Sequence, residues 1–336
     1  MSDPRPIGVF DSGVGGLTVL QEIVRRLPSE STIYLGDNGR APYGTRPDEE
    51  VLAFSTESID ALVERDVKAI VVACNTSTAV ALQQLRRRHD VPILGVIRPG
   101  AAAAALASRN RRVGVIATPA TVRSHAYFWA IKDENAAVEV YEHATPALVP
   151  LVEAGKLTGP EVDAAVADAL APLFGERDAA GDFVFPLPPS ARIDTLLLGC
   201  THYPLLRPVI AAIAGDRVAI VDSATATASA LAELLSVNAL EAPGTTRGTA
   251  ADPGRGGHDQ SVETATPPVH AQLTTGDVAR FRDLATALFG AAFTDVASIE
   301  LRGDAGKPRA RNSTPAGTEP TDIASRSTAG AGRPAQ

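Results

Sequence analysis

Short aliphatic runs recur along this 336-residue chain, and they restrict its fold more than any other feature. Each run is followed by Gly, Ser, Thr or Asn and then by a segment with helical periodicity. Runs that are apolar on both faces and alternate with helices are typical of buried parallel strands with helical crossovers. The pattern therefore predicts an α/β fold. We expect strands at residues 7–10, 32–35, 69–72, 93–96, 113–116, 138–141, 195–198 and 218–221.

The chain also contains a weak internal repeat. The run at 7–10 resembles the run at 113–116, and the segment ending at Cys74 resembles the segment ending at Cys200. Such an echo indicates two related halves. We expect two pseudo-symmetric domains, each a mainly parallel sheet flanked by helices, with the active site in the cleft between them. The expected domains comprise residues 1–98 with 208–302, and residues 99–207.

Two segments break the pattern because they are rich in Gly, Pro, Thr and charge. Residues 241–271 and 303–336 contain too few large aliphatic side chains to offset the entropy of ordering their backbone. We expect the first to be a disordered insertion and the second a disordered tail. Residues 272–289 between them return to folded sequence, with an amphipathic helix from 278. Residues 175–192 form a smaller polar insertion.

Composition and charge narrow the partners and the compartment. The formal net charge is −8 and the pI about 5.3, which argues against nucleic acid as a partner. No apolar run approaches the roughly 20 residues of a membrane helix, and the start, MSDPRPIG, lacks the apolar segment of a secretory signal. Two distant cysteines are typical of free thiols, so we expect a cytoplasmic protein. The oligomeric state stays open, and a homodimer is compatible with the sequence.

The only two cysteines have matched surroundings. Cys74 and Cys200 each follow an aliphatic run directly and precede small polar residues. Functional groups of open parallel sheets lie at the carboxyl ends of strands, and backbone N–H groups at such a turn favour the thiolate. A cysteine after an aliphatic run can also be a small buried hydrophobic residue. Because both cysteines occupy the same kind of position, we favour a functional pair.

Several chemistries fit a thiol pair poorly. A cysteine nucleophile needs one thiol and a base, a redox pair usually reads Cys-x-x-Cys, and a zinc site needs more ligands nearby than His202. Two acid/base groups on opposite faces of one carbon would invert its configuration. A pyridoxal cofactor needs a lysine, and no lysine lies in a strand-end motif. We therefore predict a two-thiol reaction without cofactor or metal, and a single-nucleophile enzyme or a non-catalytic binding protein as alternatives.

Five stretches carry a resemblance to a known family. They are IGVFDSGVGGLTVL (7–20), YLGDNGRAPYGTR (34–46), VVACNTST (71–78), VGVIATPATVRS (113–124) and LLLGCTHYPLL (196–206). Together they closely resemble the aspartate/glutamate racemase family, in the family's order through most of residues 7–302. The resemblance implies a cofactor-independent isomerase. Because residues 10–16 read FDSGVGG and lack a GGMGP-like turn, it favours glutamate as the small-molecule substrate, with D-glutamate made for peptidoglycan.

The resemblance also implies residue roles. Cys74 would take the α-proton from D-glutamate and Cys200 from L-glutamate, with Asp11 beside the first thiol and His202 beside the second. Family positions that hold substrate correspond to Asp11, Ser12, Tyr43, Gly44, Asn75, Thr76, Thr201 and His202. Thr118 and Thr121 follow another strand and are weaker candidates. Glu153 resembles a family acid, but a solvated helix face explains it equally well, so it stays outside the predicted site.

Overall fold

A computed structural model describes residues 2–177, 183–184, 192–243 and 267–302. The tail predicted at 303–336, most of the insertion at 241–271 and much of the one at 175–192 lie outside these residues. The described elements cluster in one compact unit. Within them, no helix is long and apolar enough to cross a membrane.

The first sheet has six parallel strands in the order β12-β11-β2-β1-β3-β4. Its strands are β1 (Ile7–Asp11), β2 (Thr32–Gly36), β3 (Ala69–Val72), β4 (Ile93–Gly95), β11 (His270–Thr274) and β12 (Val296–Ser298). The helices packed with it are α1 (Leu17–Arg26), α2 (Asp48–Val63), α3 (Asn75–Val80), α4 (Leu82–Arg88), α11 (Ala224–Val237) and α12 (Val278–Phe289). A short 3-10 helix, Gly290–Phe293, follows α12.

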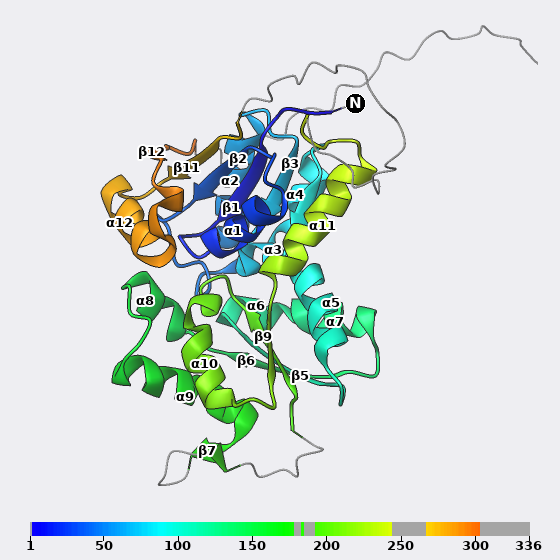
Figure 1. Cartoon of the computed structure of the whole chain (residues 1–336), viewed down its shortest axis with the longest axis vertical. Coiled ribbons are helices and arrows are strands. Elements are labelled where there is room, and N and C mark those ends of the chain that lie inside the picture. Colours follow the sequence, from blue (N-terminus) through cyan, green and yellow to red (C-terminus); the bar gives the residue numbers. More distant parts are fainter. Residues whose placement is uncertain (1, 178–182, 185–191, 244–266, 303–336) are drawn as a thin grey trace, which may run out of the picture. The chain divides into compact units, whose positions relative to one another are not determined.

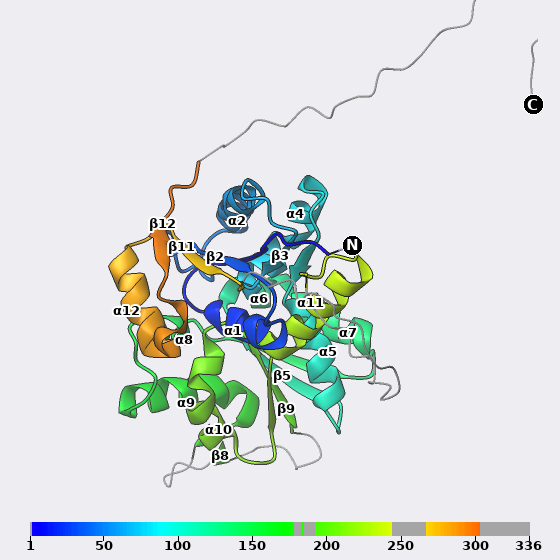
Figure 2. The same cartoon turned by 45° about the horizontal axis from the view of Figure 1, so that its top comes forward.

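Helices cover both faces of this sheet, as its continuous aliphatic strands require. Figure 2 shows α2 and α4 on one side of the strands and α1 and α11 on the other. Side chains alternate accordingly: Ile7 and Val9 belong to the core under α1 and α11, and Phe10 belongs to the core under α2 and α4. All three are fully buried. The carboxyl ends of β1 and β3 thereby become fixed, well-packed positions.

The second sheet has four parallel strands in the order β10-β9-β5-β6, and lies below the first in Figure 1. Its strands are β5 (Arg112–Ala117), β6 (Glu139–Ala144), β9 (Thr195–Gly199) and β10 (Ala219–Asp222). Its helices are α5 (Ile97–Ala107), α6 (Pro119–Ser124), α7 (Ala126–Glu134), α8 (Leu148–Glu153), α9 (Pro160–Phe174) and α10 (Arg207–Ala214). A 3-10 helix, Tyr203–Leu206, precedes α10, and a two-stranded ribbon pairs β7 (Glu176–Arg177) with β8 (Phe183–Val184).

The second sheet is covered in the same way. Leu196 and Leu198 of β9 pack in one core with α9 and α10, whereas Leu197 between them packs in another with α5 and α7. Both β9 and β3 are central strands with neighbours on each side. Each cysteine therefore follows a central strand of a different sheet.

The fold class predicted from the sequence is confirmed, since the chain has two parallel sheets flanked by helices. A strand lies at each of the eight predicted places, and α12 begins and ends at the predicted residues. Strand β10 pairs with β9 in the second sheet, although residues 208–302 were assigned to the first domain. The two-domain division remains a prediction.

The C-terminal edge of the first sheet differs from expectation. Strand β11 begins at His270, inside the segment predicted as an insertion, and β12 had no counterpart in the sequence pattern. Gln272 in β11 is buried, and the last two residues of β12, Ala297 and Ser298, are exposed. Neither strand therefore shows the continuous aliphatic run that marks the other strands.

Candidate active site

Both thiols stand at the carboxyl end of a strand. Cys74 follows β3 and caps the first turn of α3, where its sulfur accepts a hydrogen bond from the Ser77 backbone N–H at 3.4 Å. Cys200 follows β9 directly. Both are buried free thiols. The two sheets thus present one sulfur each, as expected from their matched sequence positions.

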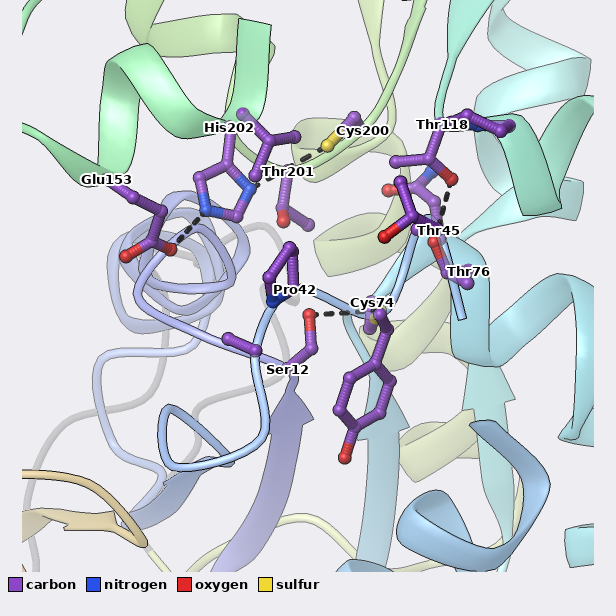
Figure 3. A pocket seen from close by; sticks show the side chains of 16 residues that line it. Ser12, Pro42, Thr45, Cys74, Thr76, Thr118, Glu153, Cys200, Thr201 and His202 are labelled. Atoms are coloured by element: carbon purple, nitrogen blue, oxygen red, sulfur yellow. Dashed lines mark hydrogen bonds and ion pairs between the residues drawn. The ribbon is translucent and has the colours of Figure 1, made fainter. Parts of the chain in front are cut away.

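One pocket collects both cysteines. Figure 3 shows Cys74 and Cys200 on opposite sides of it, with Ser12 near the first sulfur and His202 and Glu153 near the second. The lining residues are Ser12, Ala41, Pro42, Tyr43, Gly44, Thr45, Cys74, Asn75, Thr76, Thr118, Pro119, Val149, Glu153, Cys200, Thr201 and His202. The loops after strands of both sheets therefore build a single site.

The surroundings of Cys74 favour a protonated thiol. Burial, and next the negative charge of Asp11, raise the pKa of Cys74, although Ser77 acts in the opposite direction. The thiol donates to Ser12 Oγ at 3.6 Å. Cys74 therefore holds a proton at neutral pH, although the sequence predicts that its place at a strand end favours the thiolate.

The surroundings of Cys200 are different because a histidine–carboxylate pair stands beside it. His202 Nδ1 lies 3.7 Å from Cys200 Sγ, and His202 Nε2 lies 2.6 Å from Glu153 Oε1. Burial disfavours the imidazolium, but the bonds to Cys200 and Glu153 outweigh it and raise the pKa of His202 well above its usual value. Burial opposes ionisation of Glu153 too, yet His202 holds the pKa of that carboxyl below its usual value. A cationic imidazolium thus faces the second sulfur.

Asp11 lies behind the pocket wall. It is fully buried at the end of β1, where it accepts hydrogen bonds from the Gly13 N–H at 2.9 Å and from Thr201 Oγ1 at 3.2 Å. Burial raises the pKa of Asp11 to about 6, although the charge of His202 and the hydrogen bonds oppose this. Asp11 is therefore a carboxyl group that exchanges its proton close to neutral pH.

Two glycines let the loops of the first sheet lie close to the loops of the second sheet. A Cβ on Gly15 would lie 2.6 Å from Thr201 Oγ1 and from His202 Nδ1, and a Cβ on Gly44 would lie 2.6 Å from the Thr118 Cβ. No side chain fits at either glycine. The glycine-rich turn after Asp11 therefore serves as a flat surface for the loop that carries the second thiol.

A buried aspartate fixes the loop that carries Tyr43. The Tyr43 hydroxyl donates to Asp37, so its ring faces the pocket while its polar end points away. Arg40 Nε and Thr275 Oγ1 donate to the same carboxylate at 2.7 and 2.6 Å. Thr275 follows β11, so the C-terminal part of the first sheet helps to hold this loop.

A family model, curated proteins and solved structures that resemble this chain all point to one family. A family model described as Asp/Glu/Hydantoin racemase matches residues 7–181. The glutamate racemase of Shouchella clausii is 44% identical over 89% of this chain and 95% of its own, and that of Geobacter metallireducens is 49% identical over 73% and 85%. The chain belongs to the Asp/Glu/hydantoin racemase family. A glutamate racemase of Bacillus anthracis has a similar structure, with a TM-score of 0.74, 37% identity and coverage of 88% of this chain and 98% of the other.

Several structural relatives in the family were solved with a ligand. The glutamate racemase of Francisella tularensis, solved in complex with D-glutamate, has a TM-score of 0.71 and 30% identity over 89% of this chain and 98% of its own. Its coverage shows that the similarity extends across both sheets of the racemase fold.

The structure brings together the racemase-site residues that the sequence predicted. All of them line the pocket except Asp11, which contacts Thr201 from behind. Thr118, a weaker candidate, also lines the pocket and lies 2.9 Å from Thr76 through their hydroxyl oxygens. Thr121 is fully buried behind both. The positions agree with prediction, and the roles of these residues remain predictions.

Other pocket residues were not predicted. Pro42 and Thr45 belong to the YLGDNGRAPYGTR motif and Pro119 to VGVIATPATVRS, so attention to every residue of these motifs would have found them. Val149 and Glu153 come from α8. Glu153 resembles a family acid but does not belong to the predicted site, and the sequence offers no signal for Val149.

A lysine is the group that a pyridoxal cofactor would need, and acidic, histidine and cysteine side chains are those that a metal ion would need. Lys68, which precedes β3 and so lies at the opposite end of that strand from Cys74, is buried within 2.5 Å of Glu30 Oε2 and donates to the Asp3 carbonyl. In the described part of the chain, no three His, Cys, Asp or Glu side chains cluster closely enough to hold a metal ion.

Proposed function

We propose that this chain is a glutamate racemase that interconverts L- and D-glutamate with its own two thiols. The observation that carries the proposal is a single pocket lined by Cys74 and Cys200, each at the end of a central strand of a different sheet. Family membership and the glutamate racemases that resemble the chain across both sheets support the reaction.

The groups beside the two thiols indicate how the reaction begins from L-glutamate. Cys200, beside the imidazolium of His202, takes the α-proton as a thiolate, and the C–H electron pair stays on the substrate as a carbanion. Cys74 then gives its own proton to the opposite face, so the S–H bond breaks and a new C–H bond forms. The configuration is inverted, and one proton has moved from carbon to Cys200 while another has left Cys74.

From D-glutamate the same steps run in reverse. Cys74 must first lose its proton, and Asp11, whose pKa is about 6, is the neighbouring group that can accept it. His202 supplies the proton that Cys200 then delivers, because its raised pKa keeps it cationic. Each thiol therefore has its own partner for the exchange of protons.

The polar wall suits an amino acid with two carboxylates. Hydroxyls of Ser12, Thr76, Thr118 and Thr201 and the carboxamide of Asn75 line the pocket. Such groups hold carboxylates and an ammonium without leaving a buried charge unmatched. We assign substrate contacts to them and to the loop of Tyr43 and Gly44.

Single Cys→Ser variants test the proposal. Purified protein is incubated in deuterium oxide with L- or D-glutamate, without added cofactor, and both circular dichroism and α-deuteration are followed. Wild type should racemise both isomers and should not racemise aspartate at a comparable rate. C74S and C200S should each lose racemisation in both directions by about 10³-fold or more, with the double variant as background.

Two results would overturn the proposal. If either single variant keeps full racemisation in both directions, a two-base reaction does not occur. A single-nucleophile enzyme would then replace it, because only one cysteine would matter. A wild-type protein that binds glutamate without forming the other isomer would indicate a binding protein.

We further propose that the enzyme is cytoplasmic, supplies D-glutamate for peptidoglycan and forms a homodimer. Two buried free thiols support a reducing compartment, since their function requires them to stay unoxidised. Light scattering on the purified protein tests the homodimer directly, and a monomer mass at micromolar concentration would contradict it.

A further inference from the structure

Tyr127 lies at the centre of a hydrogen-bonded chain behind the pocket. Its ring is fully buried on α7, and it does not line the pocket. Its hydroxyl accepts from Asn75 Nδ2 at 2.6 Å and lies 2.9 Å from Ser223 Oγ, at the start of α11. Asn75 does line the pocket and follows Cys74 directly. The chain thus begins beside one thiol.

The same side chain also contacts the loop of the other thiol. A Cβ on Gly199 would lie 2.9 Å from Tyr127 Cε2, so the ring packs directly on the backbone that precedes Cys200. Tyr127 therefore links the residue after Cys74 with the residue before Cys200. Its hydroxyl contacts the first and its ring contacts the second.

Ser223 has little freedom to move away from this hydroxyl. It is buried, and a Cβ on Gly100 would lie 2.2 Å from its Oγ, so α5 packs closely against it. A tyrosine hydroxyl has one proton. If it accepts from Asn75, it can donate that proton to Ser223. The three side chains together fix one orientation of the Asn75 carboxamide.

We propose that Tyr127 is a positioning residue that holds the two thiol-bearing loops of the site in register. Its hydroxyl orients Asn75 on the Cys74 side, its ring supports Gly199 on the Cys200 side, and Ser223 fixes the hydroxyl. The effect on turnover rests on the proposed racemase function. Burial raises the pKa of Tyr127, so the hydroxyl stays protonated and holds Asn75 without transferring protons.

The test variant is Tyr127→Phe, which keeps the ring on Gly199 and removes only the hydroxyl. Because Asn75 would hold substrate equally in the ground and transition states, KM for both isomers should rise about tenfold while kcat falls less than about threefold. The pH limits of kcat should not move. In a double-mutant cycle, Y127F should add less than about twofold to the KM of N75A, since it acts through Asn75.

Tyr203→Phe is the matched control. Tyr203 is also fully buried, and its hydroxyl bonds only to Thr145, through Oγ1 and the carbonyl, among the described residues. This variant loses a comparable buried hydroxyl, and we expect KM within about twofold of wild type. Thermal unfolding of both variants separates lost stability from lost positioning.

A second readout does not need racemase activity. The alkylation rate of Cys74 by iodoacetamide, followed by mass spectrometry, should rise about fivefold or more in Y127F and stay near wild type in Y203F, because the Cys74 loop loses its anchor. An unchanged alkylation rate, or a KM of Y127F within twofold of wild type, would overturn the inference. A wild type that does not racemise glutamate contradicts the proposed function instead, and the alkylation result then decides the positioning role alone.

Discussion

The two thiols occupy equivalent places in their sheets, yet their chemical surroundings differ. Cys74 lies near a buried carboxyl group, Asp11, and keeps its proton, whereas Cys200 lies beside a cationic imidazole that Glu153 supports. Repetition of the fold therefore supplies the opposed positions. The residues next to each thiol make the two sides differ.

Thermodynamics limits where this difference can be observed. L- and D-glutamate have the same free energy in water, so kcat/KM must be equal in the two directions for wild type and for every variant. Side-specific effects can therefore appear only in kcat and KM taken separately, or in isotope effects on the individual proton transfers. The following predictions use those quantities.

The largest expected effect comes from the Cys200 side. His202→Asn removes the cation beside this sulfur and should lower kcat/KM about 10³-fold in both directions. The Cys200 step then becomes slowest. The isotope effect on kcat/KM should therefore be large with α-deuterated L-glutamate and small with α-deuterated D-glutamate. Equal isotope effects would contradict the assignment of His202 to Cys200.

Asp11→Asn should give the opposite pattern with a smaller loss. Without the carboxylate the Cys74 thiol loses the acceptor that we propose for its proton, and we expect kcat/KM to fall about 10²-fold. The α-deuterium isotope effect should now be large from D-glutamate and small from L-glutamate. If H202N and D11N both give the larger isotope effect with the same isomer, the two sides do not act separately.

D11N should also have a larger free energy of unfolding than wild type at alkaline pH. Burial raises the pKa of Asp11 from 3.8 to about 6, so the folded state binds this proton more tightly than the unfolded chain does. The resulting stabilisation is complete below pH 3.8 and is lost as the pH rises through about 6. At pH 8, D11N should therefore exceed wild type by on the order of 1–3 kcal/mol, and the gain should shrink towards pH 4. Denaturant unfolding at both pH values measures this, and a pH-independent difference would contradict it.

The smallest effect should come from Glu153→Gln. Losing the carboxylate lowers the pKa of His202, so the imidazolium should deprotonate at a lower pH than in wild type. Because His202 must be cationic, the alkaline limit of kcat should move to lower pH, while kcat at pH 7 should fall less than about threefold. An alkaline limit that stays in place would mean that Glu153 serves structure alone. E161Q, which changes an exposed carboxylate paired with Lys156, is the matched control.

Most of the fold could be predicted because buried parallel strands carry a direct signal. Side chains that face helices on both sides must be apolar, so β1, β3, β5 and β9 appear as continuous aliphatic runs. Strands β11 and β12 do not meet that condition. Gln272 of β11 is buried although polar, and Ala297 and Ser298 of β12 face solvent.

The candidate site could be predicted where motif and strand end coincide. Cys74 and Cys200 are such positions, and the residues next to them in the sequence could be predicted as part of the same motifs. Glu153 could not be assigned to the site, because its role depends on α8 lying against His202, 49 residues away along the chain. The contact of Tyr127 with Gly199 is invisible for the same reason, since no periodicity specifies which helix packs on a given strand end.

The order of strands in the first sheet has a consequence for biosynthesis. Strand β2 pairs with β1 on one side and with β11 on the other, and β11 and β12 are the last described strands to leave the ribosome. All four strands of the second sheet emerge earlier and can pair during translation, while β2 keeps an open edge. Since Thr275, directly after β11, donates to Asp37, which accepts from the Tyr43 hydroxyl, the loop of Tyr43 gains this anchor only after β11 has been translated.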